Sequence, residues 1–388
     1  MTNVAIRIIM AVPIFRTFSG NRKDKERMTG RERILAALSL EQPDRVPLFE
    51  LAYNESSIIG IARHFTDKLP PPKPVADMEP EELLMIFDAL ALFLEELEIE
   101  GVTARVLHHE EPLGNDYFKD KWGITYKRNP FGLAFPMEGP IKSASDLKGY
   151  RSPRFDPDTD LMMLSMVKAR FEGKKAIVFS SHDCFRYPWG LRGGLEHFLI
   201  DYMENPKLAH ELARMSTDYH KEEVSAALDA GADAVTFEDD IAFNANTLMS
   251  PAQFDEFLAP YLKELVDVVH KKGGKAIKHT DGNVWPVLDR FIEIGFDGIH
   301  PLQPQAGMDL KRVKEHCGDK VCLLGNIDCM ELLPSGTEEE VEQAVKQAIK
   351  DAAPGGGYIM ASSNTIHPGC KPENYLAMVR AARKYGTY

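Results

Sequence analysis

The chain of 388 residues is long enough for one large domain or two ordinary ones, and its 44% hydrophobic and 27% charged residues are typical of a globular protein with a sizeable core. The formal net charge of -13 argues against nucleic acid as a partner, because an acidic surface repels phosphate backbones. No apolar run reaches the roughly 18 residues of a membrane-spanning helix, so we expect no membrane association. The cysteines are few, odd in number and irregularly spaced, which argues against a disulfide framework and favours a reducing, cytoplasmic location; they are Cys184, Cys317, Cys322, Cys329 and Cys370.

The first residues imitate a signal peptide without completing one. Residues 1–15 contain a short apolar stretch, but no small-residue cleavage site follows it, and residues 16–28 are polar and basic. We therefore predict an N-terminal extension over residues 1–28 and a single domain over residues 29–388.

The first predicted helix covers residues 29–41, because Thr29 and Glu32 have the spacing of a capping box. Residues 43–50 follow as a short strand, and residues 79–100 as a strongly amphipathic helix. Residues 100–155 are less regular, with two hairpin strands at 121–129 and 132–139 inside what we interpret as an elaborated loop region.

From about residue 174, six strand-helix units follow in series. Their strands are continuous apolar runs, which is typical of a parallel sheet covered on both faces; they lie at residues 175–181, 232–240, 274–282, 296–302, 320–328 and 356–364. Two further units in the N-terminal half would bring the count to eight, so we predict the α/β class and a single (β/α)8 TIM barrel. An open doubly wound sheet is the alternative, but no G-x-G-x-x-G motif follows a strand.

Polar residues follow every strand of the second half, at the end where such barrels place their active sites. Taken singly, each is most simply explained as a helix cap, but their recurrence at one face favours a functional site. They are His182, Asp183, Glu238, Asp239, Asp240, His279, Asp281, His300, Gln303, Asn326, Asp328, Ser362, Ser363, Asn364, His367 and, slightly beyond, Cys370.

The sequence Lys275–Pro286 places His279 and Asp281 two residues apart, on the same side of an extended chain. This pair could be a metal site, a proton-transfer site or a helix cap. Histidine, carboxylate and the thiol of Cys370 on the last loop would together suit zinc. A metal-free pocket in which Cys370 is merely a packed thiol is the competing interpretation.

These residues resemble the uroporphyrinogen decarboxylase superfamily, and within it the branch of cobalamin-dependent methyltransferases. The resemblance covers about residues 28–386 and is carried by residues 29–50, 232–283 and 323–386. The combination of these segments is specific for the superfamily and less specific for one activity.

Two branches of the superfamily differ in their motifs. Its decarboxylases carry an arginine-rich R-Q-A-G-R-Y segment, whereas the corresponding residues 51–60 here contain no arginine to hold the carboxylates of a porphyrinogen. The methyltransferases often bind zinc through H-x-C and a late cysteine, which His279 and Cys370 match. Asp281 stands where the first cysteine would be and implies a harder metal site, better suited to an ether oxygen than to a thiolate.

The resemblance implies a methyltransferase that moves a methyl group from a small methylated substrate, an aromatic methyl ether, to the cobalamin of a separate corrinoid protein. We predict Glu238, His279, Asp281 and Cys370 as zinc ligands, and His182, Asp240 and His367 as catalytic or proton-donating residues. The alternatives are a decarboxylase acting on a non-porphyrin carboxylic substrate and a non-catalytic corrinoid-binding barrel. A homodimer is compatible with either alternative and with the methyltransferase.

Overall fold

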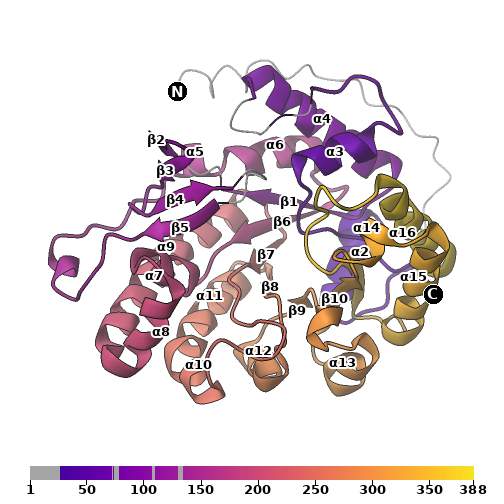
Figure 1. The fold of residues 1–388 in the computed structure, drawn as a ribbon. Coiled ribbons are helices and arrows are strands. Elements are labelled where there is room, and N and C mark those ends of the chain that lie inside the picture. The colour runs from indigo at the N-terminus through magenta and orange to yellow at the C-terminus, as the bar shows by residue number, and fades with distance from the viewer. Residues whose placement is uncertain (1–26, 72, 74–77, 107–109, 130–133) are drawn as a thin grey trace.

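A curved parallel sheet of seven strands forms the centre of the computed structural model, which describes residues 27–71, 73, 78–106, 110–129 and 134–388. The strands are hydrogen-bonded in the order in which they occur along the chain, and Figure 1 shows helices packed around the outside of the sheet. The strands are β1 (Gly101–Arg105), β6 (Ala176–Ser181), β7 (Ala234–Phe237), β8 (Lys275–His279), β9 (Gly298–His300), β10 (Cys322–Ile327) and β11 (Tyr358–Ser362).

Each strand from β6 to β11 is followed by helical structure, as the sequence predicted. The helical segment that follows β7 is divided in two near Pro260, because proline lacks an N–H and disfavours helical geometry in the residue before it. The helices are α2 (Gly30–Leu38), α3 (Glu55–Ala62), α4 (Pro80–Glu96), α5 (Pro157–Asp160), α6 (Met162–Phe171), α7 (Arg186–Leu191), α8 (Leu195–Glu204), α9 (Pro206–Asp229), α10 (Pro251–Phe257), α11 (Ala259–Lys271), α12 (Leu288–Ile294), α13 (Leu310–Cys317), α14 (Leu332–Ser335), α15 (Glu338–Ala352) and α16 (Pro372–Tyr385), with short 3-10 turns at Asp146–Lys148, Trp285–Val287 and Pro304–Ala306.

The predicted strand at residues 43–50 is not a regular strand. Leu48 forms an isolated parallel bridge to Met360 on β11, and its carbonyl accepts a hydrogen bond of 3.0 Å from the N–H of Glu100, directly before β1. The segment therefore lies between the two edges of the sheet. Pro43 and Pro47 lack the N–H groups that a continuous ladder requires, so the described sheet has seven strands where the sequence predicted eight.

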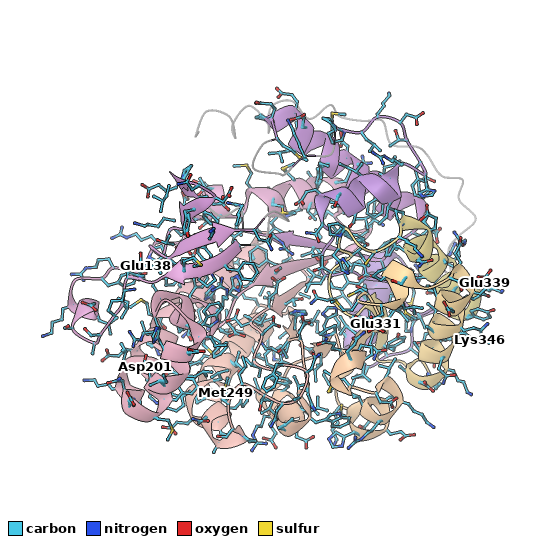
Figure 2. All side chains as sticks on the ribbon, in the orientation of Figure 1. Glu138, Asp201, Met249, Glu331, Glu339 and Lys346 are labelled. Atoms are coloured by element: carbon cyan, nitrogen blue, oxygen red, sulfur yellow. The ribbon has the colours of Figure 1, made fainter. Side chains whose placement is uncertain are left out.

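Two hydrophobic cores lie on the two faces of the sheet. The inner core is small and is closed at the N-terminal ends of the strands by α2. Its members are Ile34, Ala37, Leu38, Phe49, Ala176, Val178, Ala234, Ile277, Cys322, Leu324 and Ile359. The much larger outer core packs the helices against the sheet, so both faces are buried, which explains the continuous apolar runs. On α15, Glu339 and Lys346 project away from this core toward solvent (Figure 2).

The predicted hairpin lies in a separate four-stranded antiparallel sheet, and its two strands were predicted correctly. The order is β2 (Glu111–Gly114), β3 (Tyr117–Lys119), β4 (Thr125–Arg128) and β5 (Ala134–Glu138). Phe118 and Tyr126 stack at 5.2 Å on its buried face. This sheet attaches to the rest of the fold beside α7.

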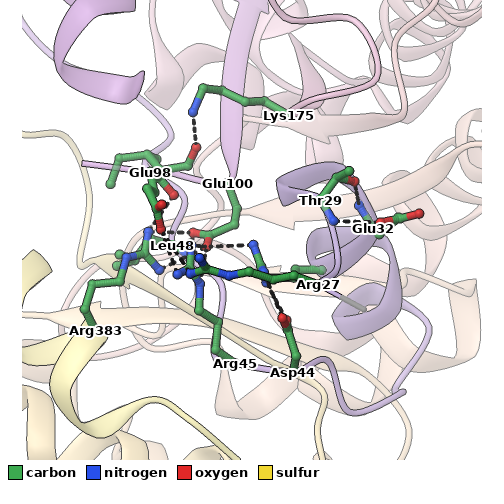
Figure 3. Close-up of polar contacts among 12 residues, drawn as sticks. Arg27, Thr29, Glu32, Asp44, Arg45, Leu48, Glu98, Glu100, Lys175 and Arg383 are labelled. Carbon is green, nitrogen blue, oxygen red and sulfur yellow. Dashed lines mark hydrogen bonds and ion pairs between the residues drawn. The ribbon is translucent and has the colours of Figure 1, made fainter. Parts of the chain in front are cut away.

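The N-terminal side of the fold is tied together by buried charge. Figure 3 shows Arg45 and Arg383 converging on the carboxylate of Glu100, whose side chain is fully buried. The capping box of Thr29 and Glu32 is present at the start of α2, as predicted. Residues 1–26 of the predicted extension lie outside the described residues. In the described part of the chain, no helix is both long and apolar enough to cross a bilayer.

Candidate metal site and cavity

The last residues of several strands point toward the inner face of the curved sheet. Side chains alternate between the two faces of a strand, so a residue two positions after an inner-core residue faces the same side. Ile277 in the inner core therefore directs His279 inward, and Val178 does the same for Ser180. These side chains lie at the end opposite to α2, where the inner core stops.

Three side chains with metal-binding atoms meet at this end of the sheet. Asp240, His279 and Asp281 each offer one ligand atom, and these atoms all lie within 4.8 Å of one another. Nε2 of His279 is 3.7 Å from Oδ1 of Asp240 and 3.8 Å from Oδ1 of Asp281. The backbone N–H of Asp281 donates to Oδ1 of Asp240 at 2.8 Å, which holds the two loops together.

The carboxylate of Asp281 is held in place without capping a helix. Its Oδ2 accepts a hydrogen bond from the amide of Asn364, whereas its Oδ1 is buried and has no hydrogen-bond partner. The turn that follows is capped instead by Asn283, whose Oδ1 accepts from the N–H of Trp285. Burial, together with the neighbouring charge of Asp240, raises the pKa of Asp281 to about 6.

This arrangement fits a small divalent cation. Bonds of about 2.0–2.1 Å in a tetrahedral zinc site separate its ligands by roughly 3.3 Å, close to the two distances from Nε2 of His279. A buried carboxylate oxygen without a partner, as in Asp281, is costly unless something binds it. The set of one nitrogen and two carboxylate oxygens suits zinc or another borderline to hard metal.

His300 lies behind His279. The two residues are register partners on the neighbouring strands β8 and β9, and their Nδ1 atoms are 2.7 Å apart. His300 is 1% exposed, and its Nε2 is buried without a hydrogen-bond partner. Burial, and then the proximity of His279, hold the pKa of His300 well below its usual range.

A small polar cavity of about 60 Å³ opens beside this cluster, at the ends of β1, β6 and β7. Glu238 forms part of its wall, with an oxygen 3.8 Å from the guanidinium of Arg105 and a hydrogen bond from Ser180. Burial alone would raise the pKa of Glu238, but Arg105 and Ser180 outweigh it and lower that pKa. The cavity is lined by Arg105, Val106, Ser180, Ser181, His182, Tyr187, His220, Glu223 and Glu238.

His182 is oriented by a carboxylate in the layer behind the cavity. Its Nδ1 lies 2.8 Å from Oδ1 of Asp239, whose other oxygen accepts backbone hydrogen bonds from the loop that starts at Asp183. Burial opposes protonation of His182, but the hydrogen bond and charge of Asp239 outweigh it and raise the pKa. The fully buried Lys278 donates to Asp183 at 2.7 Å and completes the network.

Glu223 is a member of the cavity wall that the strand-end rule could not find, because it lies in α9. Its buried carboxylate accepts a hydrogen bond of 2.6 Å from Ser181, and burial raises its pKa to about 7. The sequence contained one usable signal, namely a glutamate on the otherwise buried face of this helix. His300 and Asn364 lie at predicted strand ends in the sequence, which assigns them no role.

The remaining predicted residues lie away from the three-residue cluster. Cys370 is buried, with its Sγ 3.6 Å from the carbonyl of Cys329, and burial raises the pKa of its thiol to about 12. His367 uses both ring nitrogens within the same loops, since Nε2 donates to the carbonyl of Cys329 and Nδ1 accepts from the N–H of Gly369. Glu238 belongs to the cavity wall. Of the predicted residues, the structure brings together His279, Asp281 and Asp240. The sequence predicted Asp240 as a catalytic residue rather than as a metal ligand.

Comparison with known proteins assigns the sequence to a family. Residues 188–385, about half of the chain, match the family model for uroporphyrinogen decarboxylase (URO-D). Relatives include the uroporphyrinogen decarboxylase of Pseudoalteromonas translucida, 26% identical over 64% of this chain and 71% of its own length. That of Chlorobium luteolum is 28% identical over 76% of this chain and 84% of its own length.

Among solved structures, a methyltransferase from Methanosarcina mazei superposes with a TM-score of 0.73 over 92% of this chain and 99% of its own, at 23% identity. At that identity the likeness concerns the fold alone, and it agrees with the curved parallel sheet. The chain belongs to the uroporphyrinogen decarboxylase family.

Proposed function

We propose that this protein is a methyltransferase that moves a methyl group from a small methylated substrate, an aromatic methyl ether, to the cobalamin of a separate corrinoid protein. The observation that carries the proposal is the cluster of Asp240, His279 and Asp281 beside a polar cavity at one end of the sheet. The fold shared with a methyltransferase supports the same reaction class.

A zinc ion would be held by Asp240, His279 and Asp281, and its chemistry when bound would be to polarise the ether oxygen as a Lewis acid. This ligand set differs from the one predicted from the sequence, because Cys370 and Glu238 lie outside the cluster. Without a thiolate the site favours an oxygen substrate over a thiol.

The residues of the cavity would orient the substrate and deliver a proton. Arg105 and Glu238 offer a cation and an anion on one wall and would align a polar ring substituent. When the bond between the methyl carbon and the ether oxygen breaks, the oxygen keeps the electron pair and needs a proton. His182, whose pKa is raised by Asp239, would donate that proton. The cobalamin of the partner protein, when bound, would supply the nucleophile that receives the methyl group.

A decarboxylase acting on a small carboxylic substrate is the second candidate, because Arg105 in the cavity could bind a carboxylate. A porphyrinogen, with its many carboxylates, fits less well, since Glu223 and Glu238 share the cavity wall with that one arginine. A non-catalytic binding barrel would not explain why a carboxylate oxygen of Asp281 is buried without a hydrogen-bond partner.

The experiment incubates zinc-loaded protein with 2-methoxyphenol and with 4-methoxybenzoate, with and without cob(I)alamin. We expect the cobalamin spectrum to change and phenol to form, only when cobalamin is present, and to disappear in His279→Ala. Release of carbon dioxide, or turnover without cobalamin, would instead support the decarboxylase or another reaction.

We also propose that residues 46–50 act as the eighth element of a closed barrel, and that this barrel domain spans residues 29–388. The hydrogen bonds of Leu48 and Phe49 to both edges of the sheet support this proposal. Residues 1–28 would then precede the domain.

A further inference from the structure

The contact between His279 and His300 restricts how a metal can bind. A separation of 2.7 Å between two Nδ1 atoms is a hydrogen bond, so one of these nitrogens carries a proton and the other accepts it. In a neutral imidazole the second nitrogen has the opposite role. The position of that single proton therefore also decides whether Nε2 of His279 carries a proton or a free lone pair.

A metal requires the lone pair. Nε2 of His279 faces the carboxylates of Asp240 and Asp281, so it is the nitrogen that would bind a cation. A nitrogen with a bound proton cannot coordinate, so Nδ1 of His279 must then hold the proton and donate it to His300. His300 is the partner that can accept it, because no other hydrogen bond of this Nδ1 occurs among the described residues.

Without a cation the opposite arrangement is favoured. A lone pair on Nε2 of His279 would face the negatively charged oxygens of Asp240 and Asp281, which repel it, whereas an N–H in that position is attracted. His300 would then donate from Nδ1 to His279. The pair of histidines carries two ring protons in both arrangements. Cation binding therefore converts one arrangement into the other without a net release of protons from the pair.

We propose that His300 is a positioning residue for the metal, and that the proton between the two histidines belongs to His279 when a cation is bound and to His300 when it is absent. This inference rests on the metal site of the proposed function. It concerns binding alone, and zinc binding is measured without methyl transfer, so the two proposals can fail separately.

The backbone keeps the two rings in register. His279 and His300 pair directly across β8 and β9, and the N–H of Thr280 donates to the carbonyl of His300 at 3.1 Å. The rings lie 5.0 Å apart between centroids. Both residues are at most 5% exposed, so water does not readily replace either partner.

The first experiment measures zinc affinity by competition with a chromophoric chelator. His300→Phe keeps the ring volume but removes the acceptor, and should weaken zinc binding about 10- to 100-fold, as for other residues that orient metal ligands. His300→Asn places an oxygen where Nδ1 was and should stay within about threefold of the wild type. His210→Phe, a change of the same kind on α9, should leave the affinity unchanged.

The second experiment reads the tautomers directly and needs no variant to fold. Nitrogen-15 NMR of histidine-labelled wild-type protein should show His279 with its proton on Nε2 before zinc is added and on Nδ1 afterwards. His300 should show the reverse exchange. If zinc binds and both exchanges occur but no methyl transfer is found, the inference stands and the proposed function fails.

Three results would overturn the inference. One is a folded His300→Phe variant that binds zinc as tightly as the wild type. Another is a zinc-loaded protein in which His279 retains its proton on Nε2. The last is wild-type protein that binds no zinc at these residues.

Discussion

Replacing Glu100 by glutamine tests whether buried charge holds the N-terminal side of the fold together. The side chain of Glu100 is fully buried and lies within 3.7 Å of Arg33, 2.8 Å of Arg45 and 2.9 Å of Arg383. Its other oxygen accepts the backbone N–H of Leu48 at 2.8 Å. Glutamine has nearly the same shape, so the change removes the negative charge and leaves the arginines facing a neutral amide.

The expected cost follows from the partners that remain. Breaking a buried ion pair costs about 3–5 kcal/mol, because it leaves uncompensated charge. Arg33 keeps Asp44 and Arg45 keeps Glu98, so we expect the lower end, about 3 kcal/mol. With 388 residues the entropy of unfolding is roughly 0.8 kcal/mol per kelvin, so Tm should fall by about 4 °C.

The assay is thermal and urea unfolding followed by circular dichroism. Glu98→Gln is the matched control, because Glu98 also binds Arg45 but its side chain is 53% exposed, and exposed pairs contribute at most about 1 kcal/mol. Equal shifts for both variants, or a Glu100→Gln protein within 1 °C of the wild type, would refute the reasoning. Zinc content should not change, since Glu100 lies at the opposite end of the sheet from His279.

Three further predictions concern the site and its surroundings. Burial raises the pKa of Glu50 to about 8, so ionisation of this carboxyl lowers the stability of the fold as pH rises from about 4.5 to 8. Glu50→Gln should therefore be more stable than the wild type at pH 8, by on the order of 4 kcal/mol, and equally stable near pH 4.5. Tm measured across this pH range checks the prediction. Gly282→Ala should lower zinc affinity and stability in the chelator and unfolding assays, because φ is +94° and the added Cβ would lie 2.6 Å from the backbone nitrogen of Phe243; unchanged values would contradict this. Cys370→Ala should leave the zinc content measured by atomic emission unchanged, and a loss of zinc would return the thiol to the ligand set.

Much of the architecture could be predicted from the sequence, because it depends on local patterns. Continuous apolar runs separated by amphipathic helices specify a parallel sheet covered on both faces, and Thr29 and Glu32 specify the start of α2. The strand-end rule placed His279 and Asp281 on one face, because side-chain alternation along a strand is a local property. The predicted strand at residues 43–50 was only partly correct. Its two prolines interrupt the hydrogen-bond ladder, but the segment still lies beside the sheet.

The composition of the site was decided by contacts between distant segments. Cys370 and His367 follow the last strand, yet loop geometry turns both toward Cys329, and the same loop brings Asn364 to Asp281 instead. Glu223 reaches the cavity from α9, where no sequence rule for strand ends applies. The sequence by itself determined which residue types lie at the carboxyl ends of the strands, because chain order and side-chain alternation settle that locally. Only the tertiary structure decided which of them meet, because the curl of the sheet, the strand register and the paths of the loops set distances between residues far apart in the chain.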